Sequence, residues 1–66
     1  MNMAQAKERL YVGLEVETAR LAVVHTARGE RTAYEFLCAF DGERYFVYLD
    51  ACNGNEIAIV NVRTVG

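Results

Sequence analysis

The stretch YEFLCAFDGERYFVYLD, from Tyr34 to Asp50, decides the fold. It predicts a β-hairpin, because Asp41-Gly42 is a strong two-residue turn signal between two runs of aromatic and aliphatic residues. A hairpin on the surface of a small domain is usually apolar on one face and polar on the other. Here both faces are nearly apolar, so the sequence raises the question of what covers the second one.

Length and composition limit what the chain can do. Its 66 residues are enough for one domain, and so short a chain buries only about 60% of its unfolded surface. A hydrophobic fraction of 53% with 24% charged residues excludes a disordered tail. The net charge of -2 and the scattering of the seven basic residues argue against a nucleic-acid surface, which needs clustered Lys and Arg.

The chain shows no targeting or membrane-spanning pattern. A transmembrane helix would require a run of about 18 or more apolar residues, and the sequence has none. The N-terminal stretch MNMAQAKERL lacks the cationic start and apolar centre of a signal peptide. We therefore expect either a cytoplasmic protein or one piece of a longer protein, with no membrane contact by this chain itself.

One helix followed by four strands is the expected order of elements. Residues 3–12 are good helix formers, Asn2 can cap their start, and Gly13 is a plausible end. Apolar residues recur there at helical spacings: Met3, Ala6, Leu10 and Leu14. Strands are expected at about 18–26, 32–40, 43–51 and 55–64. We predict a single α+β domain over residues 1–66, with one N-terminal helix packed on a four-stranded antiparallel β-meander sheet.

The turns set the register, and the register assigns each side chain to a face. With Asp41-Gly42 as a two-residue loop, Phe36 lies opposite Val47. If Arg28-Gly29 forms the loop of the first hairpin, Leu21 lies opposite Phe36. The first face, which the helix is expected to cover, then carries Leu21, Val23, Tyr34, Phe36, Cys38, Phe40, Tyr45, Val47 and Leu49. The second face carries Arg20, Ala22, Val24, Glu35, Leu37, Ala39, Arg44, Phe46 and Tyr48.

The fourth strand has two possible registers. If Asn53-Gly54 alone form the loop, Ala58, Val60 and Val62 lie on the first face. If Gly54 instead sits in a left-handed bulge after a type I turn, these residues exchange faces with Ile57 and Ile59. Both registers place apolar residues on the second face.

The centre of the second face is the candidate interaction surface. Leu37, beside Phe46 and next to Tyr48, is too apolar a centre to leave in water without a reason. We expect a protein surface to cover it, most simply that of a second copy in a homodimer, with Arg20 and Arg44 at its margins. The alternative is that Arg20, Glu35 and Arg44 fold their own stems over these residues.

The chain resembles the PepSY family. YEFLCAFDGERYFVYLDACNGNEIAIV combines an aromatic hairpin with the family turn motif D-A-x-x-G-x-E, which here places Asp50, Gly54 and Glu56. The upstream AQAKER helix and RLAVVHTARGERTAYEF hairpin resemble the last PepSY module of the YpeB-type spore-germination proteins. The resemblance extends from about Ala4 to Val62.

The resemblance implies a non-catalytic regulatory or protein-interaction module. PepSY modules occur in propeptides of secreted metallopeptidases and in germination proteins that partner a cortex-lytic enzyme. A role in sporulation or spore germination, with control of such an enzyme, is the implied function, and a propeptide-like peptidase inhibitor is the alternative. The implied location is extracytoplasmic or spore-associated, although this chain shows no signal peptide or anchor and its two unpaired thiols favour a reducing environment.

Catalytic and cofactor-binding patterns are absent from the sequence. His25 is the single histidine, the chain has no serine, and no motif supplies an orienting acid or an oxyanion site. Cys38 and Cys52 lie more than about 20 Å apart along the expected sheet, too far for a disulfide. Cys38 is expected in the core and Cys52 as an exposed thiol at a turn. We therefore expect no enzymatic activity and no cofactor.

Oxygen-bearing side chains gather around the last turn and invite a comparison with a calcium loop. An EF-hand loop needs about twelve residues with ligands at fixed positions and a helix on each side, whereas strands flank this one. Turn chemistry is a sufficient explanation for its residues, so we expect no metal site at Asp50, Asn53, Asn55 and Glu56.

Overall fold

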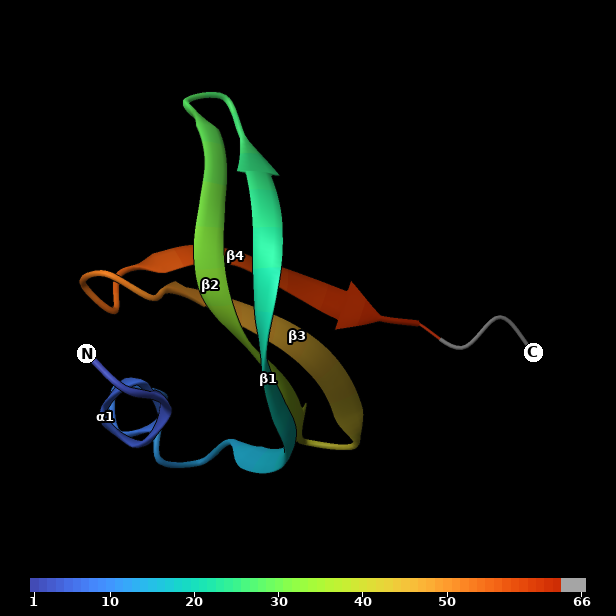
Figure 1. The fold of residues 1–66 in the computed structure, drawn as a ribbon. Helices are drawn as coiled ribbons and strands as arrows, with labels where there is room; N and C mark the ends of the chain where they lie inside the picture. The colour runs from blue at the N-terminus through green and yellow to red at the C-terminus, as the bar shows by residue number, and fades with distance from the viewer. Residues whose placement is uncertain (64–66) are drawn as a thin grey trace.

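The computed structural model describes residues 1–63. Its elements are α1 (Met3–Lys7), β1 (Glu15–Thr26), β2 (Gly29–Phe40), β3 (Glu43–Asp50) and β4 (Glu56–Val62). The strands form one antiparallel sheet in the order β1-β2-β3-β4, which confirms the predicted meander and leaves β1 and β4 as its edges. The sheet is strongly twisted, with the β1-β2 hairpin crossing steeply over β3 and β4 (Figure 1). The predicted end of the fourth strand, residue 64, lies outside the described residues.

The helix is much shorter than the sequence predicts, and the predicted architecture is wrong. Periodicity predicts a helix over residues 3–12, but α1 has five residues. The fold is a four-stranded antiparallel sheet with a short N-terminal helix, not an α+β fold with a helix packed across the sheet (Figure 1). Asn2 does cap α1 as predicted. Its side chain and that of Gln5 each accept a 2.9 Å hydrogen bond from the other residue's N–H, forming a capping box.

Tighter turns replace the helix after Lys7. The N–H of Leu10 donates to the carbonyl of Lys7, three residues earlier, at 3.1 Å, which is the 3₁₀ pattern of a helix that does not continue. An aromatic, a β-branched residue and a glycine then follow at 11–13, and all three are weaker helix formers. The apolar residues of the predicted helix nevertheless all contact the buried core: Met3, Ala6, Leu10 and Leu14.

The central hairpin has the predicted register. Asp41 and Gly42 form its two-residue loop with φ values of +49° and +78°, the left-handed conformations that a type I′ hairpin turn requires. Phe36 pairs with Val47 and Tyr34 with Leu49, as expected. The faces of β2 and β3 are therefore assigned as the sequence predicts.

The first hairpin has a different loop from the predicted one. Thr26 pairs with Gly29, so the loop consists of Ala27 and Arg28 rather than Arg28-Gly29. The Thr26 hydroxyl holds the turn, because it donates to the carbonyl of Gly29 at 2.8 Å and accepts from the N–H of Arg28 at 3.1 Å.

This loop shifts the pairing of β1 with β2 by two positions. Leu21 lies opposite Tyr34 instead of Phe36, but a shift of two keeps every residue on its predicted face. A β-bulge at Glu17 then changes the alternation near the start of β1. Because of the bulge, Val16 lies on the first face, where it packs against the core.

The fourth strand takes the second of its two possible registers. Val47 pairs with Ile59, so Ile59 lies on the first face. Gly54 has a φ of +76°, the left-handed conformation which that register requires, and the pairing with β3 is irregular at Ile57. The second face therefore gains Ala58, Val60 and Val62.

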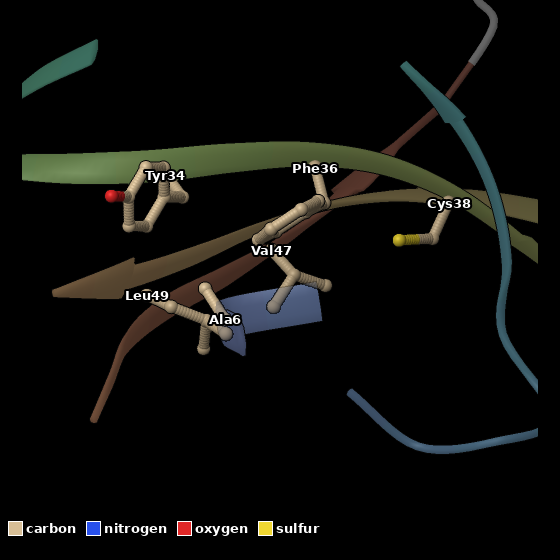
Figure 2. Close-up of a cluster of buried hydrophobic side chains, with 6 residues drawn as sticks. All are labelled: Ala6, Tyr34, Phe36, Cys38, Val47 and Leu49. Carbon is tan, nitrogen blue, oxygen red and sulfur yellow. The ribbon is translucent and has the colours of Figure 1, made fainter. Parts of the chain in front are cut away.

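The buried core lies between α1, β2 and β3, whose side chains point toward one another in Figure 2. It consists of Ala6, Tyr34, Phe36, Cys38, Val47 and Leu49. Phe36 and Cys38 are fully buried, and burying a side chain the size of Phe36 contributes about 1.5 to 3 kcal/mol. The buried first-face residues of β2 and β3 are thus the centre of the core, as predicted, but Phe40 is 43% exposed. Leu21 and Val23 of β1 are not part of the core, because each is 60% exposed.

Candidate interaction surface

The five residues predicted for the interaction surface lie together on the second face. Leu37 on β2 pairs directly with Phe46 on β3, and the Phe46 and Tyr48 rings lie 6.4 Å apart between centroids. Arg20 lies on β1 and Arg44 on β3, on either side of this centre. The three central side chains are half-buried, although among residues 1–63 the only helix packs on the other face.

A three-residue network that runs across β1, β2 and β3 borders one end of the centre. The Nε of Arg20 donates to Oε1 of Glu35 at 2.6 Å. The hydroxyl of Tyr48 donates to Oε2 of the same carboxylate at 2.8 Å. Glu35 is only 7% exposed, so these two bonds replace much of the hydration that burial removes.

The network shifts the titration of all three groups. The hydrogen bond from Arg20 lowers the pKa of Glu35, and the bond from Tyr48 lowers it further, against the opposing effect of burial. Burial raises the pKa of Tyr48, and its bond to the Glu35 carboxylate raises that pKa further. The same carboxylate raises the pKa of Arg20 through their hydrogen bond. Glu35 therefore stays ionised, and Tyr48 stays a hydrogen-bond donor, at neutral pH.

A second ion pair, between β1 and β3, borders the other end of the centre along the strands. Arg44 donates to both carboxylate oxygens of Glu17, at 2.9 and 3.3 Å. Glu17 is the bulged residue of β1, so the bulge supplies the partner of Arg44. Both side chains are largely exposed, and the pair is worth less than about 1 kcal/mol. It fixes the position of a guanidinium beside Phe46 more than it stabilises the fold.

The second face is thus an apolar centre between two fixed ion pairs. Arg20 and Arg44 are both held at its margins by carboxylates. The exposed large apolar side chain on this face is Val60, which is 50% exposed and pairs with Phe46. Part of the covering that the sequence analysis assigned to a partner is supplied by the chain itself.

The family turn motif is a closed hydrogen-bonded loop. Oδ1 of Asp50 accepts from the N–H of Cys52 at 2.8 Å, and Oδ2 accepts from Arg31 at 3.0 Å. The N–H of Gly54 donates to the carbonyl of Asp50 at 2.7 Å. Oδ1 of Asn53 accepts from the N–H two residues later at 2.8 Å. The side-chain oxygens of Asp50 and Asn53 are therefore already bonded, either within the turn or to Arg31 on β2, and Glu56 lies beyond the turn at the start of β4.

The first face is the one that the chain leaves partly open. Because α1 has only five residues, it contributes a single buried side chain, Ala6, to this face. Large apolar side chains remain exposed there at fractions of 43% to 64%: Tyr11, Leu21, Val23, Phe40 and Ile59. Leu21, Val23 and Phe40 were predicted to lie under a helix, and the structure leaves all three exposed. The run of aromatic, β-branched and glycine residues at 11–13 was the signal that the helix ends early.

A shallow apolar groove runs along this face beside β4. Its volume is about 230 Å³, and it is lined by Tyr11, Leu14, Phe40, Tyr45, Val47 and Ile59. The rings of Tyr11 and Phe40 meet edge to face, with centroids 5.8 Å apart. A second groove of about 520 Å³ continues from it toward Gly54 and Glu56.

The remaining candidate residues stand apart from one another. His25 lies near the end of β1, exposed, with Nδ1 3.7 Å from a carboxylate oxygen of Glu30. Cys38 is buried and Cys52 is exposed, as predicted, and both thiols are free. Residues 1–63 contain no group of three or more His, Cys, Asp or Glu side chains that could hold a metal ion. The same residues contain no helix of the length and apolarity needed to cross a bilayer.

The twisted meander, the aromatic hairpin and the closed D-A-x-x-G turn define a PepSY-like module. The fold is that of the Bacillus megaterium YpeB C-terminal domain, with a TM-score of 0.91 over 97% of this chain and 26% sequence identity. The chain spans 29% of the length of that structure. No family model and no curated protein sequence matches the chain. The similarity to the YpeB C-terminal domain suggests a non-catalytic module.

Proposed function

We propose that the chain is a non-catalytic PepSY-type module that binds another protein through its second sheet face. The supporting observation is the apolar centre of Leu37, Phe46 and Tyr48 on a face that carries no helix among residues 1–63. Arg20 and Arg44 are held beside it by their carboxylate partners. Interfaces favour this arrangement, in which aromatic residues form the centre and charged groups form the margin.

The similarity to a longer chain supports a role beside other domains. The matched region makes up less than a third of the YpeB C-terminal domain structure. A fold that recurs as one part of such a chain suits binding to a neighbouring protein surface. By the same similarity, we propose a role in spore germination, with a cortex-lytic enzyme as the partner, outside the cytoplasm.

The second face is assigned to a different protein and not to a second copy. Sequence analysis expected a homodimer there. In the structure, however, the network of Arg20, Glu35 and Tyr48 already borders that centre, and the most exposed apolar side chains of the sheet lie elsewhere. Because ion pairs border the apolar centre of this face, it suits a partner protein whose own charged groups are complementary to them.

Titration of the isotope-labelled chain with a cortex-lytic enzyme from spores tests this function. We expect amide signals of the second face to shift on β2 and β3, and Phe46→Glu to weaken binding at least about tenfold, because the carboxylate would be buried without a partner. Leu21→Glu is the matched control, since Leu21 is 60% exposed on the first face. Absence of binding, or equal loss in both variants, would contradict the proposal.

A further inference from the structure

β4 is an edge strand without the features that normally keep sheet edges apart. Residues 57–62 contain no charged residue and no proline, and the irregularity in its pairing falls at its beginning, at Ile57. Ile59 on the first face is 55% exposed and Val60 on the second face is 50% exposed. Long apolar edges are usually blocked by Lys, Pro, bulges or a covering element, because their free N–H and C=O groups accept another strand.

The other edge of the sheet is protected. β1 has a β-bulge at Glu17 in its first half. Charged side chains also stand along it, at Glu15, Glu17 and Arg20, and His25 is near its end. β1 also exposes Leu21 and Val23, at 60% each, but its bulge and its charged residues distinguish it from β4, whose uncharged stretch has neither after Ile57.

We propose that β4 pairs antiparallel with β4 of a second copy of this chain, about a two-fold axis near Ile59 and Val60. The two four-stranded sheets then join into one sheet of eight strands. The same surface meets itself across the axis, so the contact closes at a dimer and does not propagate. The second face of each copy stays open on the same side of the joined sheet.

Charge complementarity indicates a second copy as the occupant. Glu56 and Arg63 are the charged residues on either side of the uncharged stretch, and each is three residues from the nearer of Ile59 and Val60. Antiparallel pairing brings Glu56 of each copy toward Arg63 of the other at both ends of the new ladder. Parallel pairing would instead bring like charges together, which is destabilising across a sheet.

The first-face groove gives the pairing an apolar component. Ile59 forms part of the wall of that groove, which Tyr11 and Phe40 also line. Side chains directly opposite in an antiparallel pair lie about 5 Å apart, so the partner's Ile59 would lie against this wall. The Ile59 side chain, which is exposed in the isolated chain, would then be covered by the partner copy.

The dimer is expected to be weak. One strand pair with a shallow groove buries less than the roughly 1,600 Å² of a standard stable interface. The association should therefore depend on concentration and be complete only at high concentration, with a dissociation constant in the range of about 1 μM to 1 mM.

Sedimentation equilibrium over a concentration series tests the proposal, with Ile59→Lys and Val60→Lys as edge variants. We expect the wild-type mass to rise from one chain toward two, and each edge variant to weaken dimerisation at least about tenfold while melting at the wild-type temperature. Leu21→Lys is the matched control, because Leu21 is 60% exposed on the other edge strand, and it should dimerise like the wild type. Amides of β4 should exchange more slowly as concentration rises.

Three results would overturn the proposal. The first is a wild type that stays monomeric up to about 1 mM, which would leave the edge to another occupant, such as a strand of a peptidase. The second is growth beyond two chains, which would exclude a closed two-fold contact. The third is a dimer that survives Ile59→Lys and is lost in Leu37→Glu, because this pattern would place the contact on the second face. Loss of the β4 dimer in Ile59→Lys leaves the proposed second-face binding intact, since Ile59 lies on the opposite face.

Discussion

Replacing Tyr48 with phenylalanine removes one hydroxyl from the second face and leaves the aromatic ring in place. That hydroxyl donates a 2.8 Å hydrogen bond to Glu35, a carboxylate that is only 7% exposed. After the substitution, Arg20 remains as the side-chain partner of the carboxylate through its own 2.6 Å bond. One oxygen of a nearly buried anion is then left without its donor.

The expected loss follows from the charge and burial of the acceptor. A hydrogen bond to a charged group contributes about 1.5 to 3 kcal/mol. Because Arg20 still neutralises Glu35 after the change, we expect a loss between that of a neutral hydrogen bond and that of a charged one, about 1 to 2 kcal/mol of unfolding free energy. In a domain of this size each kcal/mol corresponds to roughly 4 to 8 °C of melting temperature, so Tyr48→Phe should melt about 5 to 15 °C lower.

The effect should depend on pH with a defined sign. The folded protein lowers the pKa of Glu35, chiefly through the hydrogen bond from Arg20 and also through that from Tyr48. The stabilisation from this carboxylate is therefore complete above the ordinary glutamate pKa of about 4.3. It is lost as the pH falls below that value and through the lowered pKa. The melting difference between wild type and Tyr48→Phe should thus be smaller at low pH than at pH 7.

Thermal unfolding followed by circular dichroism measures both differences, and the chain supplies a matched control. Tyr45, on the same strand, donates a 2.9 Å bond to Glu43, which is exposed. Tyr45→Phe should therefore cost no more than about 0.5 kcal/mol. Equal losses in Tyr45→Phe and Tyr48→Phe, or a Tyr48→Phe loss that is the same at low and neutral pH, would refute the reasoning.

Two further predictions concern the thiols and the motif turn. One thiol per chain, Cys52, should react with Ellman's reagent in the folded protein, because Cys38 is fully buried and burial raises its pKa; two rapid reactions without denaturant would contradict this. Gly54→Ala should lower the unfolding free energy by about 1 to 3 kcal/mol, since Gly54 has a φ of +76° and an added Cβ would lie 2.7 Å from the Met1 side chain. A urea titration with an unchanged midpoint would contradict that.

Local turn chemistry explains which registers the sequence could predict. Asp41-Gly42 allows left-handed φ at both positions and sits between two clear strands, so the register of β2 and β3 followed from it. In the first hairpin, three adjacent residues offered two possible loops. The choice was made by the Thr26 hydroxyl, which bonds across Ala27 and Arg28. The bulge at Glu17 changes the apolar alternation only at Val16, and one apolar residue does not distinguish a bulge from the end of a strand.

The N-terminal helix shows what helical spacing in a sequence does not predict. Helical spacing correctly identified four residues that contact the core, but two of them, Leu10 and Leu14, reach it from turns beyond α1. The spacing of apolar residues predicts which side chains are buried. It does not predict the backbone conformation, because a helix and a series of turns can bury the same side chains. An isolated helix of about ten residues is marginal without tertiary packing. The residues at 11–13 are weak helix formers, so they favour an early end of the helix.

The length of the helix changes which surface needs a partner. A full helix over residues 3–12 would have covered the first face and left the second as the open one. With five helical residues, the first face keeps exposed apolar side chains at both ends of the sheet, including Ile59 at the β4 edge. The second face, by contrast, is bordered by the Glu35 network and by the Arg44 pair. Self-association through the edge of β4 and binding of a different protein at Leu37, Phe46 and Tyr48 therefore use surfaces that meet only at Val60, so a joined sheet presents two copies of the second face to its partners.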